Sequence, residues 1–151
     1  MNQLIQDYGL LSMFLLSFFA SSILPIASEW LLITLILKGL NPLSVLFTAT
    51  LGNYLGACTT YYIGYIGSDF LIKKLLRLDE KTKNKAEKFY KKYGVYSLLM
   101  SWLPIIGDPL CIIAGMLKVK FLKFSFLVYV GKFIRYGITT YLTVKGMNLL
   151  N

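Results

Sequence analysis

One short run of residues occurs twice in this chain, and each occurrence contains a carboxylic acid within an apolar stretch. The run Leu24–Glu29 returns as Leu103–Asp108, 79 positions later. The same offset, with no gap, pairs further identical residues: Gly52 with Gly131, Thr60 with Thr139, Tyr62 with Tyr141 and Gly67 with Gly146. The chain therefore consists of two copies of one unit. Duplication combined with interrupted hydrophobic segments is typical of transporter-type membrane folds.

The composition and the placement of charge also favour a membrane protein. Hydrophobic residues make up 56% of the chain and charged residues 15%, whereas a soluble domain of 151 residues needs more polar surface. The segment Asp69–Lys92 holds nine of the 16 Lys and Arg residues, which gather on the cytoplasmic side of membranes. We expect anionic lipid headgroups, and not nucleic acid, beside this segment, because no nucleic-acid-binding module accompanies the charge.

No metal, cofactor or removable signal peptide is predicted. The chain has no histidine, and Cys58 and Cys111 stand in apolar runs without a partner at metal-ligand spacing. The first eight residues have no basic region, and no cleavage motif follows them.

Two of the four apolar blocks are interrupted. The blocks are residues 10–37, 42–66, 94–117 and 121–144, and the second and fourth predict ordinary spanning helices. The first breaks around Pro25 to Glu29, and the third breaks at Pro104, Gly107 and Pro109. Each half is too short to cross a core of roughly 30 Å, so each broken block predicts a re-entrant hairpin that reaches mid-membrane.

A hairpin adds no net crossing and the helix after it adds one, so the two units are predicted to be inverted relative to each other. The predicted fold is thus an all-α integral membrane protein with two inverted repeats, each a re-entrant hairpin plus a transmembrane helix. The whole of 1–151 forms one membrane domain. Repeat one covers about 8–67, an amphipathic cytoplasmic connector covers about 69–92, and repeat two covers about 93–146.

Glu29 and Asp108 are the first candidate functional residues. A carboxylate at membrane depth is costly and is a functional candidate for that reason, with proton uptake and release as one role. An alternative is that each acid caps the half-helix that begins beside it. The recurrence of an acid in both copies favours function, because Ser or Thr would cap at lower cost.

Lys132 and Arg135 are the candidate cations. They lie three residues apart inside the last apolar block and therefore share one helix face. Their counterparts in the first copy are Asn53, itself a candidate polar residue of the site, and Gly56. Arg135 is suited to pair with an acid or to bind a phosphate. Alternatively, the two side chains extend to the nearer membrane interface.

Motifs around these residues cover nearly the whole chain. Residues 25–29, PIASE, are similar to P-x-P-x-E with Ala27 at the second proline, and residues 52–56 fit G-[DN]-x-x-G. Residues 101–110 fit S-W-L-P-x-x-G-D-P-L, and residues 131–136 fit G-K-x-x-R-Y. Together they resemble the DedA family of the SNARE-associated Golgi protein (VTT) superfamily, in particular its short YqaA-like branch.

The resemblance implies a multi-pass protein of the bacterial inner membrane with two opposed re-entrant loops. Family members are linked to the movement of phospholipids and undecaprenyl phosphate between leaflets, often with dependence on the proton gradient. Larger DedA proteins carry two arginines around the second hairpin's proline, and those places fall near Ser101 and Gly107 here. Phosphate recognition would then need Arg135 and Lys132 instead.

The preferred function is transport of a lipid or lipid-linked anion between leaflets, with Glu29 and Asp108 as central carboxylates and protons as the coupling ion. The alternatives are a secondary transporter of small solutes and a membrane assembly protein without a substrate, each compatible with a homo-oligomer. An enzyme is not expected. Intramembrane aspartyl proteases use paired acids, but one acid here is Glu, and Ile105–Asp108 lacks the first glycine of G-x-G-D.

Overall fold

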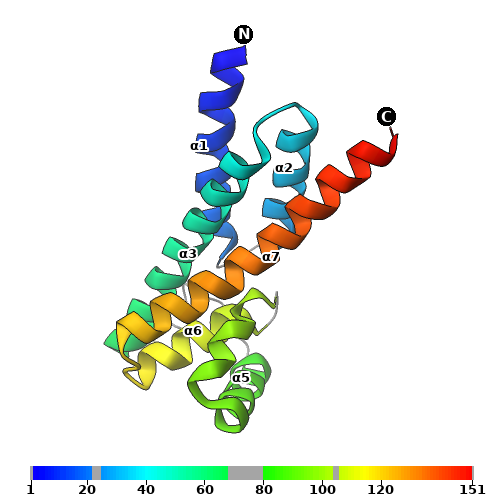
Figure 1. Ribbon diagram of the computed structural model, residues 1–151. Helices are drawn as coiled ribbons and strands as arrows, with labels where there is room; N and C mark the ends of the chain where they lie inside the picture. Colours follow the sequence, from blue (N-terminus) through cyan, green and yellow to red (C-terminus); the bar gives the residue numbers. More distant parts are fainter. Residues whose placement is uncertain (1, 22–24, 68–79, 104–105, 151) are drawn as a thin grey trace.

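The computed structural model describes residues 2–21, 25–67, 80–103 and 106–150, and these residues form helices joined by short turns, without strands. The all-α prediction is confirmed for them. In chain order the helices are α1 (Asn2–Ala20), α2 (Pro25–Leu37), α3 (Pro42–Ile66), α5 (Glu80–Tyr93), the 3₁₀ helix η1 (Gly94–Trp102), α6 (Gly107–Met116) and α7 (Phe121–Leu150) (Figure 1).

α3 covers the block predicted at 42–66, and α7 extends the block predicted at 121–144 as far as Leu150. In the described part of the chain, no helix combines the length and the apolar character that a membrane crossing requires. The two spanning helices therefore stay a prediction.

The first break lies earlier than predicted. α1 ends at Ala20 and α2 begins at Pro25, so the predicted break at residues 25–29 is wrong by about one turn. The reason is that proline fits the first position of a helix, where its missing N–H would have no intrahelical partner. Glu29 is consequently the fifth residue of α2, one turn inside the helix.

The second break lies where it was predicted. η1 ends at Trp102 and α6 begins at Gly107, with Pro109 as its third residue. Pro104 lies outside the described residues. The segment before this break is a 3₁₀ helix of nine residues. The 3₁₀ form rises about 2.0 Å per residue, so η1 reaches further than an α-helix of the same length.

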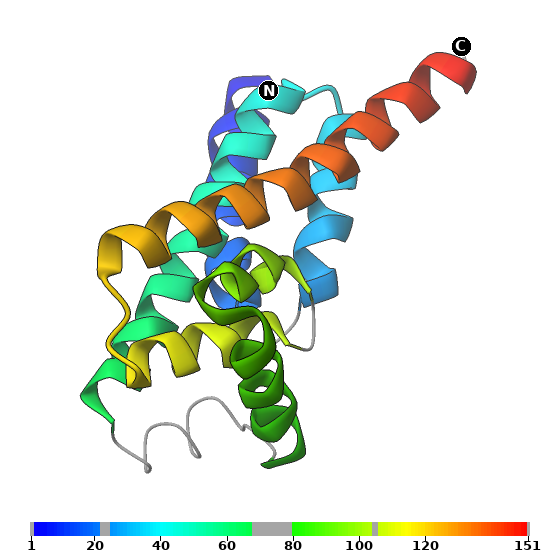
Figure 2. The ribbon, with the colours of Figure 1, turned by 60° about the horizontal axis from the view of Figure 1, so that its bottom comes forward.

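The two broken segments open toward opposite ends of the molecule. α1 and α2 pack together, and α2 ends close to the end of the molecule that also holds both chain termini (Figure 1). α6 runs from the middle toward the other end, where α7 begins and where α5 also lies (Figure 2). α3 and α7 pack against each other as they pass between the two ends.

The connector was predicted at about 69–92. From Glu80 onward it is helical and belongs to α5, whereas residues 69–79 lie outside the described residues. α5 packs against η1 and α6. Ala86 is fully buried there, and Phe89 and Tyr90 pack against the same core, while most lysines of α5 face outward. The apolar side of this helix is thus covered by protein.

Glycines allow α3 to approach its neighbours closely. A Cβ atom at Gly52 would lie 2.5 Å from the carbonyl oxygen of Phe14 in α1. At Gly115 of α6, a Cβ atom would lie 2.0 Å from the carbonyl oxygen of Tyr61 in α3. Any larger residue at either position would force the helix backbones apart.

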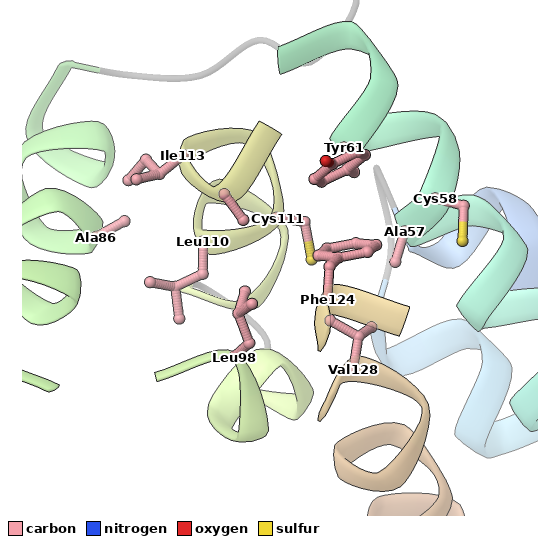
Figure 3. Close-up of a cluster of buried hydrophobic side chains, with 11 residues drawn as sticks. Ala57, Cys58, Tyr61, Ala86, Leu98, Leu110, Cys111, Ile113, Phe124 and Val128 are labelled. Carbon is pink, nitrogen blue, oxygen red and sulfur yellow. The ribbon is translucent and has the colours of Figure 1, made fainter. Parts of the chain in front are cut away.

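The buried apolar side chains form two clusters. The first, shown in Figure 3, joins α3, α5, η1, α6 and α7: Ala57, Cys58, Tyr61, Ala86, Leu98, Leu110, Cys111, Ile113, Ala114, Phe124 and Val128. The second joins α1, α2, the start of α3 and the later part of α7: Met13, Leu32, Leu35, Ile36, Leu40, Val45, Leu46, Ala49 and Tyr136. On α3, position 53 separates the residues of the first cluster from those of the second. Position 132 does the same on α7. A layer between the cores is therefore occupied by polar residues.

Candidate functional site

Lys132 is the most buried charged residue of this layer, with 3% of its surface exposed. Its Nζ donates a hydrogen bond to Oδ1 of Asn53 and lies 4.0 Å from Oδ1 of Asp108. Burial of a single charge is costly, and these two acceptors provide the compensation. Lys132 therefore points into the protein, and the alternative in which it extends to a membrane interface is wrong.

Asn53 uses both ends of its amide in this layer. Its Nδ2 donates to the backbone carbonyl of Ser17 in α1 at 3.0 Å, while its Oδ1 accepts from Lys132. The bond to α1 fixes which end of the amide faces the lysine. Asn53 and Lys132 stand at the same position of the two copies, so this contact joins equivalent residues.

Asp108 is the second residue of α6 and lies beside Lys132. Its Oδ1 accepts a hydrogen bond of 3.1 Å from the Ser21 hydroxyl, just after the end of α1. The residue at the cap position of α6 is Ile106, and no side chain makes a capping hydrogen bond there. The position in the first turn still favours a negative charge, because the N-terminus of a helix is partly positive.

Glu29 forms the second acid–cation pair. Its Oε1 accepts a hydrogen bond of 2.7 Å from Nε of Arg135. A terminal nitrogen of the same guanidinium donates to the backbone carbonyl of Trp102 at 3.0 Å, at the end of η1. Arg135 thus connects α7 with both broken segments. Because Glu29 lies beyond the first turn of α2, the prediction that it sits at the helix start, where it could cap, is wrong.

The two pairs form one electrically balanced arrangement. Each acid comes from the helix after a break, and both cations come from consecutive turns of α7. The acids are the more accessible partners, since the side chains of Glu29 and Asp108 are 30% and 23% exposed, against 13% for Arg135 and 4% for Lys132. A guanidinium and an ammonium group placed in this way can bind the oxygens of a carboxylate or a phosphate.

Serine hydroxyls complete the polar layer, and sequence reasoning did not select them. Ser21 donates to Asp108, and the Ser28 hydroxyl lies 2.9 Å from the Tyr136 hydroxyl. Among the described residues, the buried hydroxyl of Ser101 has no hydrogen-bond partner. The signal that could have found Ser21 and Ser28 is their place in an apolar block on either side of a helix break.

The five candidate polar residues therefore occupy one layer, and the described residues among those predicted to break the hairpins lie at the starts of α2 and α6. Gly107 and Pro109 begin α6, and Pro25 begins α2. Within the described ranges, no group of three or more His, Cys, Asp or Glu residues is placed to hold a metal ion.

This fold and site define a helical protein with two broken segments and a layer of paired charges between them. The VTT domain family matches residues 24–145, a range that includes both acids, both cations and Asn53. The chain belongs to this family, and the resemblance to its YqaA-like members is confirmed.

Three relatives illustrate the similarity. Inner membrane protein YqaA of Escherichia coli (strain K12) is 37% identical over 140 residues, which cover 92% of this chain and 94% of YqaA. The uncharacterized membrane protein YbfM of Bacillus subtilis (strain 168) is 32% identical over 88% of this chain and 87% of its own. An uncharacterized protein of Haemophilus influenzae is 32% identical over 91% of this chain and 89% of its own. No solved structure matches the chain.

Proposed function

We propose that this protein is a multi-pass protein of the bacterial inner membrane that moves a lipid or lipid-linked anion between leaflets. The observation that carries the proposal is the layer of two acid–cation pairs beside the two helix breaks. Charges inside a membrane protein mark substrate or proton pathways by default. The names of two relatives, an inner membrane protein and a membrane protein, agree with this location.

Exposed apolar residues support a lipid-facing surface. They recur at spacings of four residues, with one spacing of eight on α7 where Val130 is half-buried, so that each series follows one side of its helix. On α3 they are Leu43, Phe47, Leu51 and Leu55, and on α7 they are Leu122, Phe126, Ile134 and Ile138. Large apolar patches on a protein surface mark contact with other proteins or with membranes. Two such series on the helices predicted to span favour contact with lipid.

The inverted-repeat arrangement also has structural support. Asn53 and Lys132 are equivalent positions that touch, as expected near a two-fold axis relating the two units. The packing of α1 on α3 corresponds to that of η1 on α7, and the packing of α3 on α6 corresponds to that of α7 on α2. The hydrogen bond from Ser21 to Asp108, beside the two breaks, supports broken segments that approach each other near mid-membrane.

The chemistry of the layer suits exchange between a phosphate and a carboxylate. The planar guanidinium of Arg135 binds carboxylate and phosphate in the same way, and Lys132 supplies a second positive charge. An entering phosphate would upset the balance of two acids and two cations. A proton taken up by Glu29 or Asp108 would reduce the added negative charge and free a cation, so anion entry and proton uptake favour each other.

The substrate class follows from the narrow polar layer. The described helices pack around two apolar clusters with that layer between them, which leaves little room for a wide aqueous channel. A headgroup can instead cross the thin polar layer while its hydrocarbon tails stay in the surrounding lipid. This favours an amphiphilic anion over a bulky soluble solute.

The test is leaflet exchange in liposomes that contain purified protein and fluorescent phosphatidylglycerol. We expect faster exchange than in protein-free liposomes, and a change of rate when a pH gradient is imposed. Glu29→Gln and Asp108→Asn should each remove most of the acceleration while leaving membrane insertion intact, because they keep the shape of the side chain and remove the titrating group. Glu87→Gln, on α5, is the matched control and should behave like the parent protein.

The lipid-transport proposal would be wrong if phospholipids and polyprenyl phosphates both exchanged at the protein-free rate, with and without the gradient. A carrier of small solutes or an assembly protein would then be favoured. Full activity of both acid variants would remove the carboxylates from the mechanism.

A further inference from the structure

The turn between α6 and α7 contains an unusual backbone conformation. Lys118 has φ of +53°, and among the described residues it is the one non-glycine residue with positive φ. L-residues other than glycine and asparagine rarely adopt this left-handed conformation, because the Cβ atom crowds the backbone. The residue after the end of a helix often needs it, and glycine is then the usual choice.

The first copy of the unit has glycine at the same place. Gly39, 79 positions before Lys118, has φ of +88° and follows the end of α2. The two turns close with the same pair of backbone hydrogen bonds: Gly39 to Ile36 and Leu40 to Leu35 in one, Lys118 to Gly115 and Val119 to Ala114 in the other. The geometry of the turn therefore accounts for glycine at position 39. It gives no reason for lysine at position 118. Strain of this kind is concentrated at functional sites, where the side chain has a use.

The side chain of Lys118 lines a surface pocket. The pocket has a volume of about 400 Å³, and its walls include Tyr61, Tyr62, Tyr65, Lys118, Lys120 and Phe121. The Lys118 ammonium lies over the Tyr65 ring, 5.8 Å from its centre. The Tyr61 hydroxyl donates a hydrogen bond of 2.5 Å to the backbone carbonyl of Val119, which holds the turn against α3. Two lysines thus line a pocket whose walls are largely aromatic.

We propose that this pocket binds the phosphate-bearing headgroup of an anionic phospholipid. Lys118 and Lys120 supply the complementary charge, and exposed tyrosines beside lysines are the composition expected where a protein meets lipid headgroups. The exposed rings of Tyr62, Tyr65 and Phe121 offer apolar contact to the glycerol and upper acyl chains, which a free phosphate ion does not use.

The pocket is separate from the layer of paired charges. Lys118 follows the C-terminal end of α6, whereas Asp108 lies at its start, so about 12 Å of helix separates them. The proposal rests on the membrane location proposed above and not on lipid translocation. A binding measurement therefore tests it independently of the leaflet-exchange assay.

The experiment is a titration of the detergent-purified protein with phosphatidylglycerol, followed by native mass spectrometry, with phosphatidylcholine and inorganic phosphate in parallel. Four variants are compared with the parent: Lys118→Gln, Lys118→Gly, Lys118→Arg and Lys85→Gln. Lys118→Gln removes the charge, and Lys118→Gly removes both the charge and the strain. Lys118→Arg keeps the charge, and Lys85→Gln removes one charge from the exposed side of α5 as a control.

Phosphatidylglycerol should bind more tightly than phosphatidylcholine. Lys118→Gln and Lys118→Gly should each weaken its binding about fivefold, while Lys118→Arg and Lys85→Gln leave it within twofold of the parent. Lys118→Gly should also keep or raise the melting temperature, which separates loss of binding from loss of folding. Unchanged binding in Lys118→Gln, or an equal loss in Lys85→Gln, would overturn the proposal. Inorganic phosphate that binds with the same dependence on Lys118 would identify a free-anion site and overturn the lipid assignment.

Discussion

Arg135 uses different nitrogens of one guanidinium group for a carboxylate and for a backbone carbonyl. One nitrogen binds the Glu29 carboxylate and another binds the Trp102 carbonyl, so the residue holds α2 and η1 against α7. Both contacts depend on the planar shape of the group, which spreads its donors over a fixed fork. A lysine at this place keeps the charge and loses the fork.

We predict that Arg135→Lys lowers the leaflet-exchange rate about tenfold. A charge-assisted hydrogen bond contributes about 1.5–3 kcal/mol, and a loss of about 1.4 kcal/mol corresponds to a factor of ten. The control is Lys123→Arg, at an exposed position of α7 outside the layer, which should leave the rate unchanged. If the parent and the Lys and Gln variants at position 135 were equally active, Arg135 would have no part in the mechanism.

The sequence allowed the charged residues of the layer to be selected and did not allow their pairing to be predicted. Charges inside apolar blocks must find partners, so Glu29, Asp108, Lys132 and Arg135 could be expected to lie together. Which acid meets which cation depends on how α7 crosses the broken segments. The Trp102 carbonyl could not be predicted at all, because every residue carries a backbone acceptor.

At the scale of the helices, the contact between α3 and α6 depends on glycine. The space between the two backbones at Gly115 is too small for a Cβ atom, which would meet the Tyr61 carbonyl at 2.0 Å. α6 carries Asp108 at its other end. Any displacement of α6 away from α3 would therefore also move the acid relative to Lys132.

We predict that Gly115→Ala lowers the free energy of unfolding by about 1–3 kcal/mol, the usual effect of overpacking. Gly146→Ala is the matched control, because no neighbouring element has an atom within 4 Å of a Cβ atom at that position of α7. It should be neutral or stabilising by up to about 1 kcal/mol, since alanine favours a helix more than glycine. Unfolding in mixed micelles would compare them. Equal stability of the two variants would contradict close packing of α3 on α6.

Helix breaks could be predicted from sequence to within about one turn. Proline marks a boundary without telling which side of it is helical, and Pro25 proved to begin α2 and not to end the helix before it. The 3₁₀ form of η1 had no signal in its composition. Its sequence is as apolar as that of an α-helix, and the helix packs against α6 and α7.

At the scale of the whole molecule, both chain termini lie at one end and α5 lies at the other (Figure 1). We predict that the lysine-rich end faces the cytoplasm and that the termini face the opposite side. The protein without Cys58 and Cys111 would receive one new cysteine, by Lys85→Cys or Asn148→Cys. An impermeant thiol reagent should label position 148 from outside intact spheroplasts, and should label position 85 only after the membrane is opened. Labelling of both positions from the same side would contradict the hairpin topology.

The contact between Asn53 and Lys132 has an evolutionary consequence. The two residues occupy one position of the repeated unit, so a dimer of identical units would bring two asparagines or two lysines together there. Two lysines would repel each other, and two asparagines would leave a neighbouring acid without a cation. One acceptor can stand opposite one cation only where the two units differ at this position, as the two halves of this chain do. The central charge arrangement therefore depends on the difference between the halves, and neither half could replace the other.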